Sequence, residues 1–112
     1  MMNADHHFWM GKTHNVCEDY AMSGTSGGVS YAIVSDGCSS SPDTDFGARI
    51  LARAALKHIY QAWSLEKYSD SVINTARSGA LSLGLPQRAL DATLLVAVEW
   101  EKKVHVMSWL CC

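Results

Sequence analysis

Residues 28–37, Gly-Val-Ser-Tyr-Ala-Ile-Val-Ser-Asp-Gly, contain the clearest strand signal in the chain. The run from Val29 to Val34 is rich in β-branched and aromatic side chains and alternates little between polar and apolar residues, which predicts a strand covered on both faces. This strand ends in Ser35-Asp36-Gly37, so the sequence places a carboxylate at the end of a rigid apolar element.

Two helices are predicted after this strand. Apolar side chains recur at three- and four-residue spacing from about 44 to about 63, and Asp43 or Thr44 can cap the first turn. The second helix is expected to begin after Asp70 and to end before the Gly and Pro of residues 83–86. The side chains predicted to face inward are Phe46, Ile50, Leu51, Ala54, Ala55, Ile59 and Ala62, followed by Val72, Ile73, Ala76, Ala80 and Leu81.

The remaining segments predict a turn and a hairpin. Residues 23–28 are a cluster of small residues typical of a turn, and strands at 93–100 and 104–109 flank a short polar connection. The order of elements indicates an α+β fold, an antiparallel sheet with two helices packed on one face. Because the strands are apolar on both sides, the other face needs more chain or another molecule, and we expect self-association through the exposed sheet.

Composition limits the functions that the chain can have. The 112 residues are 48% hydrophobic and 18% charged, which is typical of one globular domain. A net charge of -2 provides no basic surface for a nucleic acid, and no apolar run approaches the roughly 20 residues that span a bilayer. We therefore expect a cytoplasmic protein with no nucleic-acid or membrane partner. Its four cysteines, expected to be reduced, are Cys17, Cys38, Cys111 and Cys112.

Two acidic positions are candidates for chemistry: Glu18-Asp19, and Asp36-Gly37. Mg²⁺ and Mn²⁺ prefer oxygen ligands and keep several waters, so a few carboxylates and one backbone carbonyl suffice to hold them. A glycine after Asp36 is expected to let the backbone turn, so that its own carbonyl can face the same ion. Taken singly, each position is more often a solvated charge or an ordinary turn, and their joint context favours a metal site.

Three segments together carry a family resemblance. Residues 11–21 (GKTHNVCEDYA), 28–37 (GVSYAIVSDG) and 91–98 (DATLLVAV), the last followed by a hairpin, resemble type 2C (PPM-type) metal-dependent serine/threonine protein phosphatases. The resemblance covers roughly residues 11–109 and implies part of a type 2C phosphatase-like β-sandwich. We expect residues 1–10 to be a flexible N-terminus, and 11–112 to be the N-terminal part of such a domain, truncated before the family's later metal-binding aspartates.

The resemblance also implies roles for individual residues. Asp36 would be the carboxylate that bridges two Mn²⁺ or Mg²⁺ ions, with Asp19 as its catalytic companion. Gly37 would contribute its carbonyl, and Glu18 and Asp19 would hold metal-bound waters. His14 stands where the family has a phosphate-binding arginine, and Cys38 replaces a histidine proposed as a general acid in some members. The substrate would be a phosphorylated protein.

Three hypotheses follow. The first is a protein phosphatase that hydrolyses phosphoserine and phosphothreonine with a water activated by two metal ions. The second is a non-catalytic phosphatase-like remnant that acts as a binding or assembly module. The third is a redox or zinc site built from Cys17, Cys38 and His14. Metal preference separates them, because Mn²⁺ favours oxygen ligands and Zn²⁺ accepts thiolates.

Overall fold

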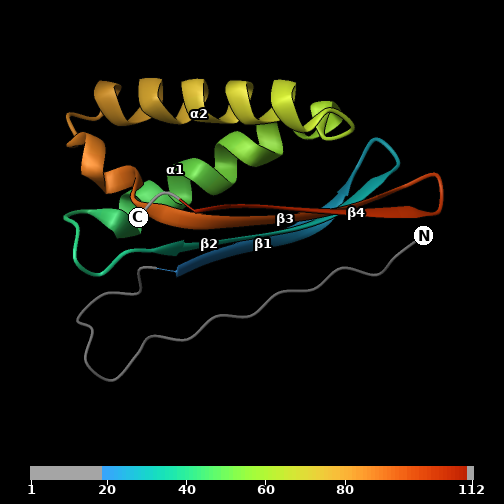
Figure 1. The fold of residues 1–112 in the computed structure, drawn as a ribbon, viewed down its shortest axis with the longest axis horizontal. Helices are drawn as coiled ribbons and strands as arrows, with labels where there is room; N and C mark the ends of the chain where they lie inside the picture. The colour runs from blue at the N-terminus through green and yellow to red at the C-terminus, as the bar shows by residue number, and fades with distance from the viewer. Residues whose placement is uncertain (1–18, 111–112) are drawn as a thin grey trace.

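The chain forms one antiparallel sheet with two helices stacked on one of its faces (Figure 1). This computed structural model describes residues 19–110. The sheet has four strands in the order β1-β2-β3-β4, which confirms the predicted α+β fold. The elements are β1 (Asp19–Ser26), β2 (Val29–Gly37), α1 (Thr44–Lys57), η1 (Ile59–Gln61), α2 (Leu65–Ser82), η2 (Gln87–Leu90), β3 (Ala92–Trp100) and β4 (Lys103–Leu110).

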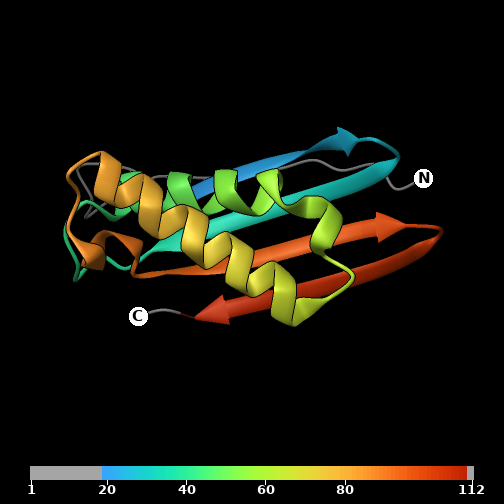
Figure 2. The same cartoon turned by 90° about the horizontal axis from the view of Figure 1, so that it is seen from above.

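The strand that the sequence singled out, β2, lies at the centre of the sheet and pairs with both β1 and β3. Its alternate side chains Val29, Tyr31 and Ile33 are buried beneath the helices, whereas Val34 on the other face is 42% exposed. Figure 2 shows α1 above β1 and β2, and α2 crossing diagonally above the sheet. As the sequence predicted, the two helices cover one face only.

Residues 23–28, predicted to be a turn, are mostly strand. β1 continues to Ser26, and the turn is confined to Gly27 and Gly28, both at positive φ. Gly24 suits this strand because Tyr31, directly opposite, needs the space: a Cβ at position 24 would lie 2.8 Å from the Tyr31 hydroxyl. Small residues here therefore accommodate a cross-strand aromatic ring rather than only forming a turn.

The β3–β4 hairpin is confirmed. Its two turn residues, Glu101 and Lys102, have φ values of 52° and 64°. Two consecutive residues at positive φ are typical of the type I′ turn, whose twist matches that of the flanking strands.

The helix boundaries differ from the prediction. α1 ends at Lys57 and is followed by the short η1, whereas α2 begins before Asp70, at Leu65. Two side chains predicted to face inward are exposed, Phe46 by 52% and Leu81 by 80%. In α2 the buried row is made of residues at four-residue spacing, and Leu81 lies about 100° around the helix from that row. The buried side chains of this row are Tyr68, Val72, Ala76 and Ala80.

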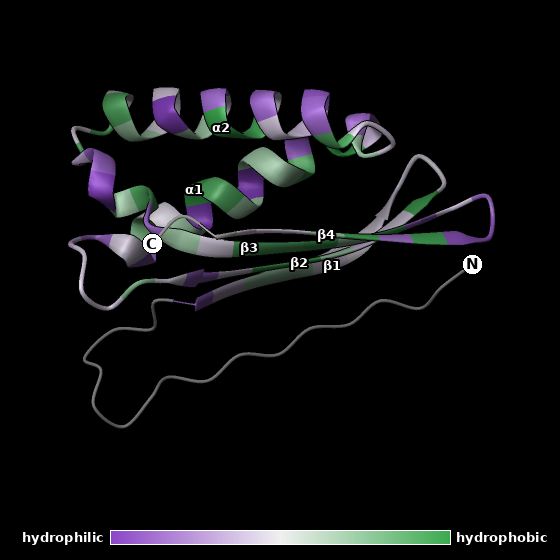
Figure 3. Ribbon diagram, viewed as in Figure 1, coloured by the Kyte–Doolittle hydropathy of each residue, from purple (hydrophilic) through white to green (hydrophobic). Residues whose placement is uncertain are grey.

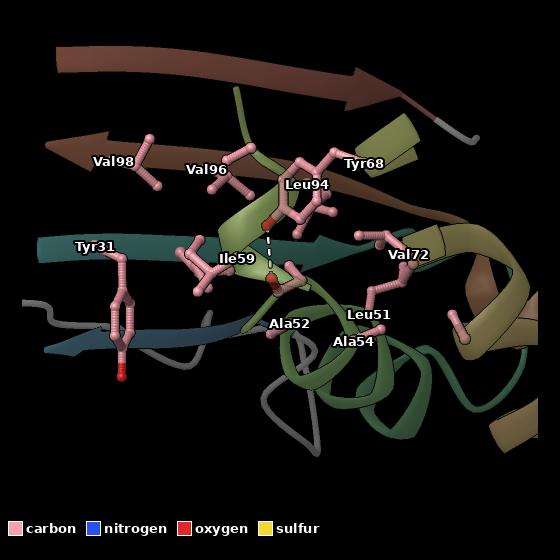
Figure 4. Close-up of a cluster of buried hydrophobic side chains, with 14 of the residues drawn as sticks. Tyr31, Leu51, Ala52, Ala54, Ile59, Tyr68, Val72, Leu94, Val96 and Val98 are labelled. Atoms are coloured by element: carbon pink, nitrogen blue, oxygen red, sulfur yellow. Dashed lines mark hydrogen bonds between the residues drawn. The ribbon is translucent and has the colours of Figure 1, made fainter. Parts of the chain in front are cut away.

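The core lies between the sheet and the helices (Figure 4). Figure 3 shows hydrophobic residues along the strands. Buried strand residues such as Ile33, Leu94 and Val96 belong to this core. Tyr68 is fully buried, and its hydroxyl donates a hydrogen bond of 2.6 Å to the Ala55 carbonyl near the end of α1. The Tyr68 ring also meets Trp109 edge to face, with centroids 5.8 Å apart, and the Trp109 indole nitrogen donates to Ser69 at 2.6 Å.

Among the described residues, no helix combines the length and hydropathy needed to cross a membrane.

We expect Tyr68→Phe to lower the free energy of unfolding by about 1–3 kcal/mol, because the Ala55 carbonyl would lose a buried donor.

Burial also raises the pKa of Tyr68 above its ordinary value. Above about pH 10 the unfolded tyrosine therefore ionises while the folded one stays protonated. Stability should thus be unaffected by this group below that pH and fall as the pH rises beyond it. Urea unfolding measured between pH 7 and pH 11 checks both effects.

The control is Tyr60→Phe, at a tyrosine that is 56% exposed. The alkaline loss of stability should be smaller in Tyr68→Phe than in the parent chain or in Tyr60→Phe. If the free energy of unfolding falls equally steeply with pH above about pH 10 in all three proteins, Tyr68 does not cause the effect.

Candidate metal centre

Two of the predicted metal ligands lie directly opposite each other in the sheet. In the pairing of β1 with β2, Asp19 stands across from Asp36, at the end of the sheet where α1 begins. Side chains directly opposite on antiparallel strands have Cβ atoms about 4.5–5.5 Å apart and share one face of the sheet. Asp36 is exposed and Asp19 is partly exposed. Both carboxylates therefore stand on the face that the helices leave open.

This pair of like charges suits a cation. Two carboxylates directly opposite each other destabilise a sheet, with a Coulomb repulsion of about 1 kcal/mol in water. The neighbour of Asp36 on its other side is Thr93 of β3, which adds a hydroxyl to the same end of the sheet. Carboxylate, carbonyl and hydroxyl oxygens are the hard donors that Mg²⁺ and Mn²⁺ prefer. The described donors thus fit a divalent cation, which would remove the repulsion.

Gly37 is required for a different reason from the one expected. Its φ lies outside the left-handed region, so the glycine does not serve an unusual backbone conformation. A Cβ at position 37 would instead lie 2.8 Å from Cβ, Oγ1 and the carbonyl oxygen of Thr44, the first residue of α1. The glycine allows α1 to begin close against the end of β2, next to Asp36.

The other predicted ligands, Glu18 and His14, lie outside the described residues, as does Cys17. Within residues 19–110, the His, Cys, Asp and Glu side chains form no cluster of three or more that could hold a metal ion. Cys38 is disulfide-bonded, so the expectation of reduced thiols is wrong for this residue. A sulfur in a disulfide is not a thiolate, which removes a ligand from the thiol-based zinc hypothesis.

The loop after Gly37 is held by a network that sequence reasoning missed. Ser41 is buried, and its hydroxyl donates a hydrogen bond of 2.6 Å to Oδ2 of Asp91, which lies 3.6 Å from Nε of Arg88. The backbone N–H of Cys38 donates to the Asp91 carbonyl at 2.8 Å. Ser41 and Asp91 are 50 residues apart, and neither belongs to a local motif, so only the folded chain brings them together.

The start of α1 also departs from the prediction. Asp43 occupies the N-cap position in a left-handed conformation, with φ at 59°, and its side chain makes no capping hydrogen bond. Thr44 is fully buried, and its hydroxyl donates to the Cys38 carbonyl at 3.1 Å. Thr44, the first residue of α1, therefore secures the helix to the loop after β2, and neither predicted residue caps the helix with its side chain.

Comparison with known proteins identifies a family for the chain. The family model described as protein phosphatase 2C matches residues 11–109, which includes every described strand and helix except the last residue of β4. No curated protein and no solved structure matches the chain. With nearly the whole sequence matched in one continuous segment, the chain belongs to the protein phosphatase 2C family.

Proposed function

We propose that this protein hydrolyses phosphoserine and phosphothreonine in protein substrates with the help of Mn²⁺ or Mg²⁺. The observation that carries the proposal is the Asp19–Asp36 pair, placed directly opposite at one end of the sheet in a chain of the phosphatase 2C family. Asp36, Asp19 and the Gly37 carbonyl would hold the metal from the described residues. Glu18 and His14 would add a carboxylate and a phosphate contact.

Each described residue has a distinct part in this proposal. Bound metal would supply positive charge that activates water and offsets the charge of the phosphate group. Asp36 stands at the end of the central strand, where pairing on both sides fixes its backbone. Asp19 adds the second carboxylate from the neighbouring strand. Because Asp36 is exposed, a phosphorylated segment of another protein can reach it without any rearrangement of the helices.

The direct test measures hydrolysis of a small phosphate ester and of a phosphothreonine peptide. We expect turnover with Mn²⁺ or Mg²⁺, none in the presence of a chelator, and weaker support by Zn²⁺. Phosphate release that persists in the chelator, or that requires Zn²⁺, would contradict the proposed oxygen-ligated centre. If no metal supports phosphate release and the chain does not bind Mn²⁺, the non-catalytic hypothesis is favoured.

A second candidate function is an assembly module, and the open face of the sheet favours it. Val34 and Leu95 are directly opposite each other on β2 and β3, and they are 42% and 45% exposed. Val104 and Val106 extend the same face along β4, with exposures of 58% and 64%. We propose that a second copy of the chain covers the apolar part of this face, since two such apolar surfaces can pack together around a two-fold axis.

We expect Leu95→Lys to weaken this self-association by roughly tenfold or more, since burial of a leucine contributes about 1.5–3 kcal/mol. The fold should persist because Leu95 is already 45% exposed. Sedimentation velocity over a range of concentrations measures the effect. Leu81→Lys, at an exposed leucine of α2, is the matched control and should self-associate like the parent. A parent chain that is monomeric throughout would refute the proposal.

A further inference from the structure

We propose that Asp91 is a positioning residue for the metal centre, and that it acts by fixing the strand end that carries Asp36 and Gly37. This inference rests on the proposed function. Asp91 matches no metal-binding position in the sequence. It comes directly before β3, which begins at Ala92 opposite Gly37, so its backbone lies beside the end of β2.

The first connection is through the backbone. In the sheet, Asp36 pairs with Thr93 and Gly37 pairs with Ala92. The hydrogen bond of 2.8 Å from the Cys38 N–H to the Asp91 carbonyl extends this pairing by one residue beyond Gly37. Strand ends fray where pairing stops, so this added bond moves the fraying point away from Asp36.

The second connection is through side chains. The Asp91 carboxylate accepts a hydrogen bond of 2.6 Å from Ser41, and the Arg88 guanidinium donates to the same Ser41 hydroxyl at 3.2 Å. Ser41 in turn donates its backbone N–H to the Cys38 carbonyl at 3.1 Å, which closes a tight turn over residues 38–41. Asp91 thus holds both ends of this turn: the Cys38 end by its carbonyl and the Ser41 end by its carboxylate.

The geometry separates this role from metal binding. Oδ2 of Asp91 is engaged by Ser41 and lies 3.6 Å from Arg88, which is a fixed positive charge. The Asp91 carboxylate thus contacts residues of the loop after β2 and of η2, whereas the pair Asp19–Asp36 lies on β1 and β2. A carboxylate that orients the segment carrying a ligand, without contacting the ion, changes metal affinity by about 10- to 100-fold in other metal sites.

The test measures Mn²⁺ affinity from the electron paramagnetic resonance signal of free Mn²⁺. We expect Ser41→Ala and Asp91→Ala each to raise the Kd about tenfold, and the double variant to raise it no further, because the two side chains act as one unit. Asp91→Asn keeps an acceptor for the Ser41 hydroxyl and should recover most of the affinity. Tyr68→Phe, which loses a buried hydrogen bond elsewhere, is the control for lost stability and should bind Mn²⁺ like the parent.

Amide hydrogen exchange supplies a second measurement that does not involve metal. The Cys38 amide should exchange faster in Ser41→Ala and Asp91→Ala, and at the parental rate in Tyr68→Phe. If the parent binds Mn²⁺ and both alanine variants bind it with the same Kd, the positioning role alone is overturned. A parent that binds no Mn²⁺ would overturn the proposed function and this inference with it. Unchanged exchange at Cys38 in folded variants would overturn the inference regardless of metal.

Discussion

Asp36→Asn is expected to reduce Mn²⁺-dependent hydrolysis by more than about 100-fold, beyond the 10- to 100-fold cost of losing a residue that only supports a metal ligand. The substitution keeps the size of the side chain but removes one of two facing charges. In the absence of metal the variant should therefore be as stable as the parent or more stable, by up to about 1 kcal/mol. Activity and stability change in opposite directions, which a general loss of folding cannot produce.

Two measurements on purified protein check this prediction: the initial rate of phosphate release with Mn²⁺, and the rise in Tm on adding Mn²⁺. A ligand that binds only the folded state stabilises it, so the parent should show this rise and Asp36→Asn should lose it. Asp70→Asn, at an exposed aspartate of α2, is the matched control and should retain both. Full activity in Asp36→Asn would exclude Asp36 as the essential carboxylate.

Gly47→Ala is expected to lower the free energy of unfolding by about 3 kcal/mol, the upper part of the range for overpacked sites. Gly47 is buried in the first turns of α1, and a Cβ there would overlap the carbonyl carbon and oxygen of Ala89 in η2. These neighbours are backbone atoms, so they cannot move away as a flexible side chain would. Helix α1 and η2 must separate instead, and η2 leads directly into Asp91 and β3.

The matched control is Gly79→Ala in α2. A Cβ at position 79 would make an ordinary contact of 3.4 Å with Cγ2 of Ile50. Replacing a helical glycine with alanine where space allows should raise stability by about 0.5–1 kcal/mol. Urea unfolding of the two variants should therefore move the midpoint in opposite directions. A Gly47→Ala protein as stable as the parent would show that α1 and η2 need not pack so closely.

The predicted metal site illustrates how far sequence reasoning extends. Asp36 could be proposed from the sequence, because an apolar strand that ends in Asp-Gly holds a carboxylate rigidly and the Glu18-Asp19 pair and the family resemblance supply the context. That Asp19 stands directly opposite depends on the register of β1 with β2, which the folded sheet specifies. The packing role of Gly37 was missed for a similar reason: its neighbour Thr44 is close only when α1 has packed against the strand.

The helices show the same division. The three- and four-residue spacing of apolar side chains correctly predicted α1 and α2, and two strand-like segments joined by a short polar connection predicted the β3–β4 hairpin. Periodicity does not set where a helix ends or which flank of its apolar stripe is covered. Phe46 and Leu81 are exposed because α1 packs on the sheet, and α2 mainly on α1, through a narrower stripe that is rich in alanine.

The α+β class, the strand that ends at Asp36-Gly37, the hairpin, the family resemblance and the acidic positions could all be read from the sequence. These depend on local preference and on short-range patterns, which are present in the chain before it folds. Three contacts became visible only in the folded chain: the pairing of Asp19 with Asp36, the close approach of Gly47 to Ala89, and the hydrogen bond from Ser41 to Asp91. The first depends on the register of two strands, and the other two depend on how segments distant along the chain pack together.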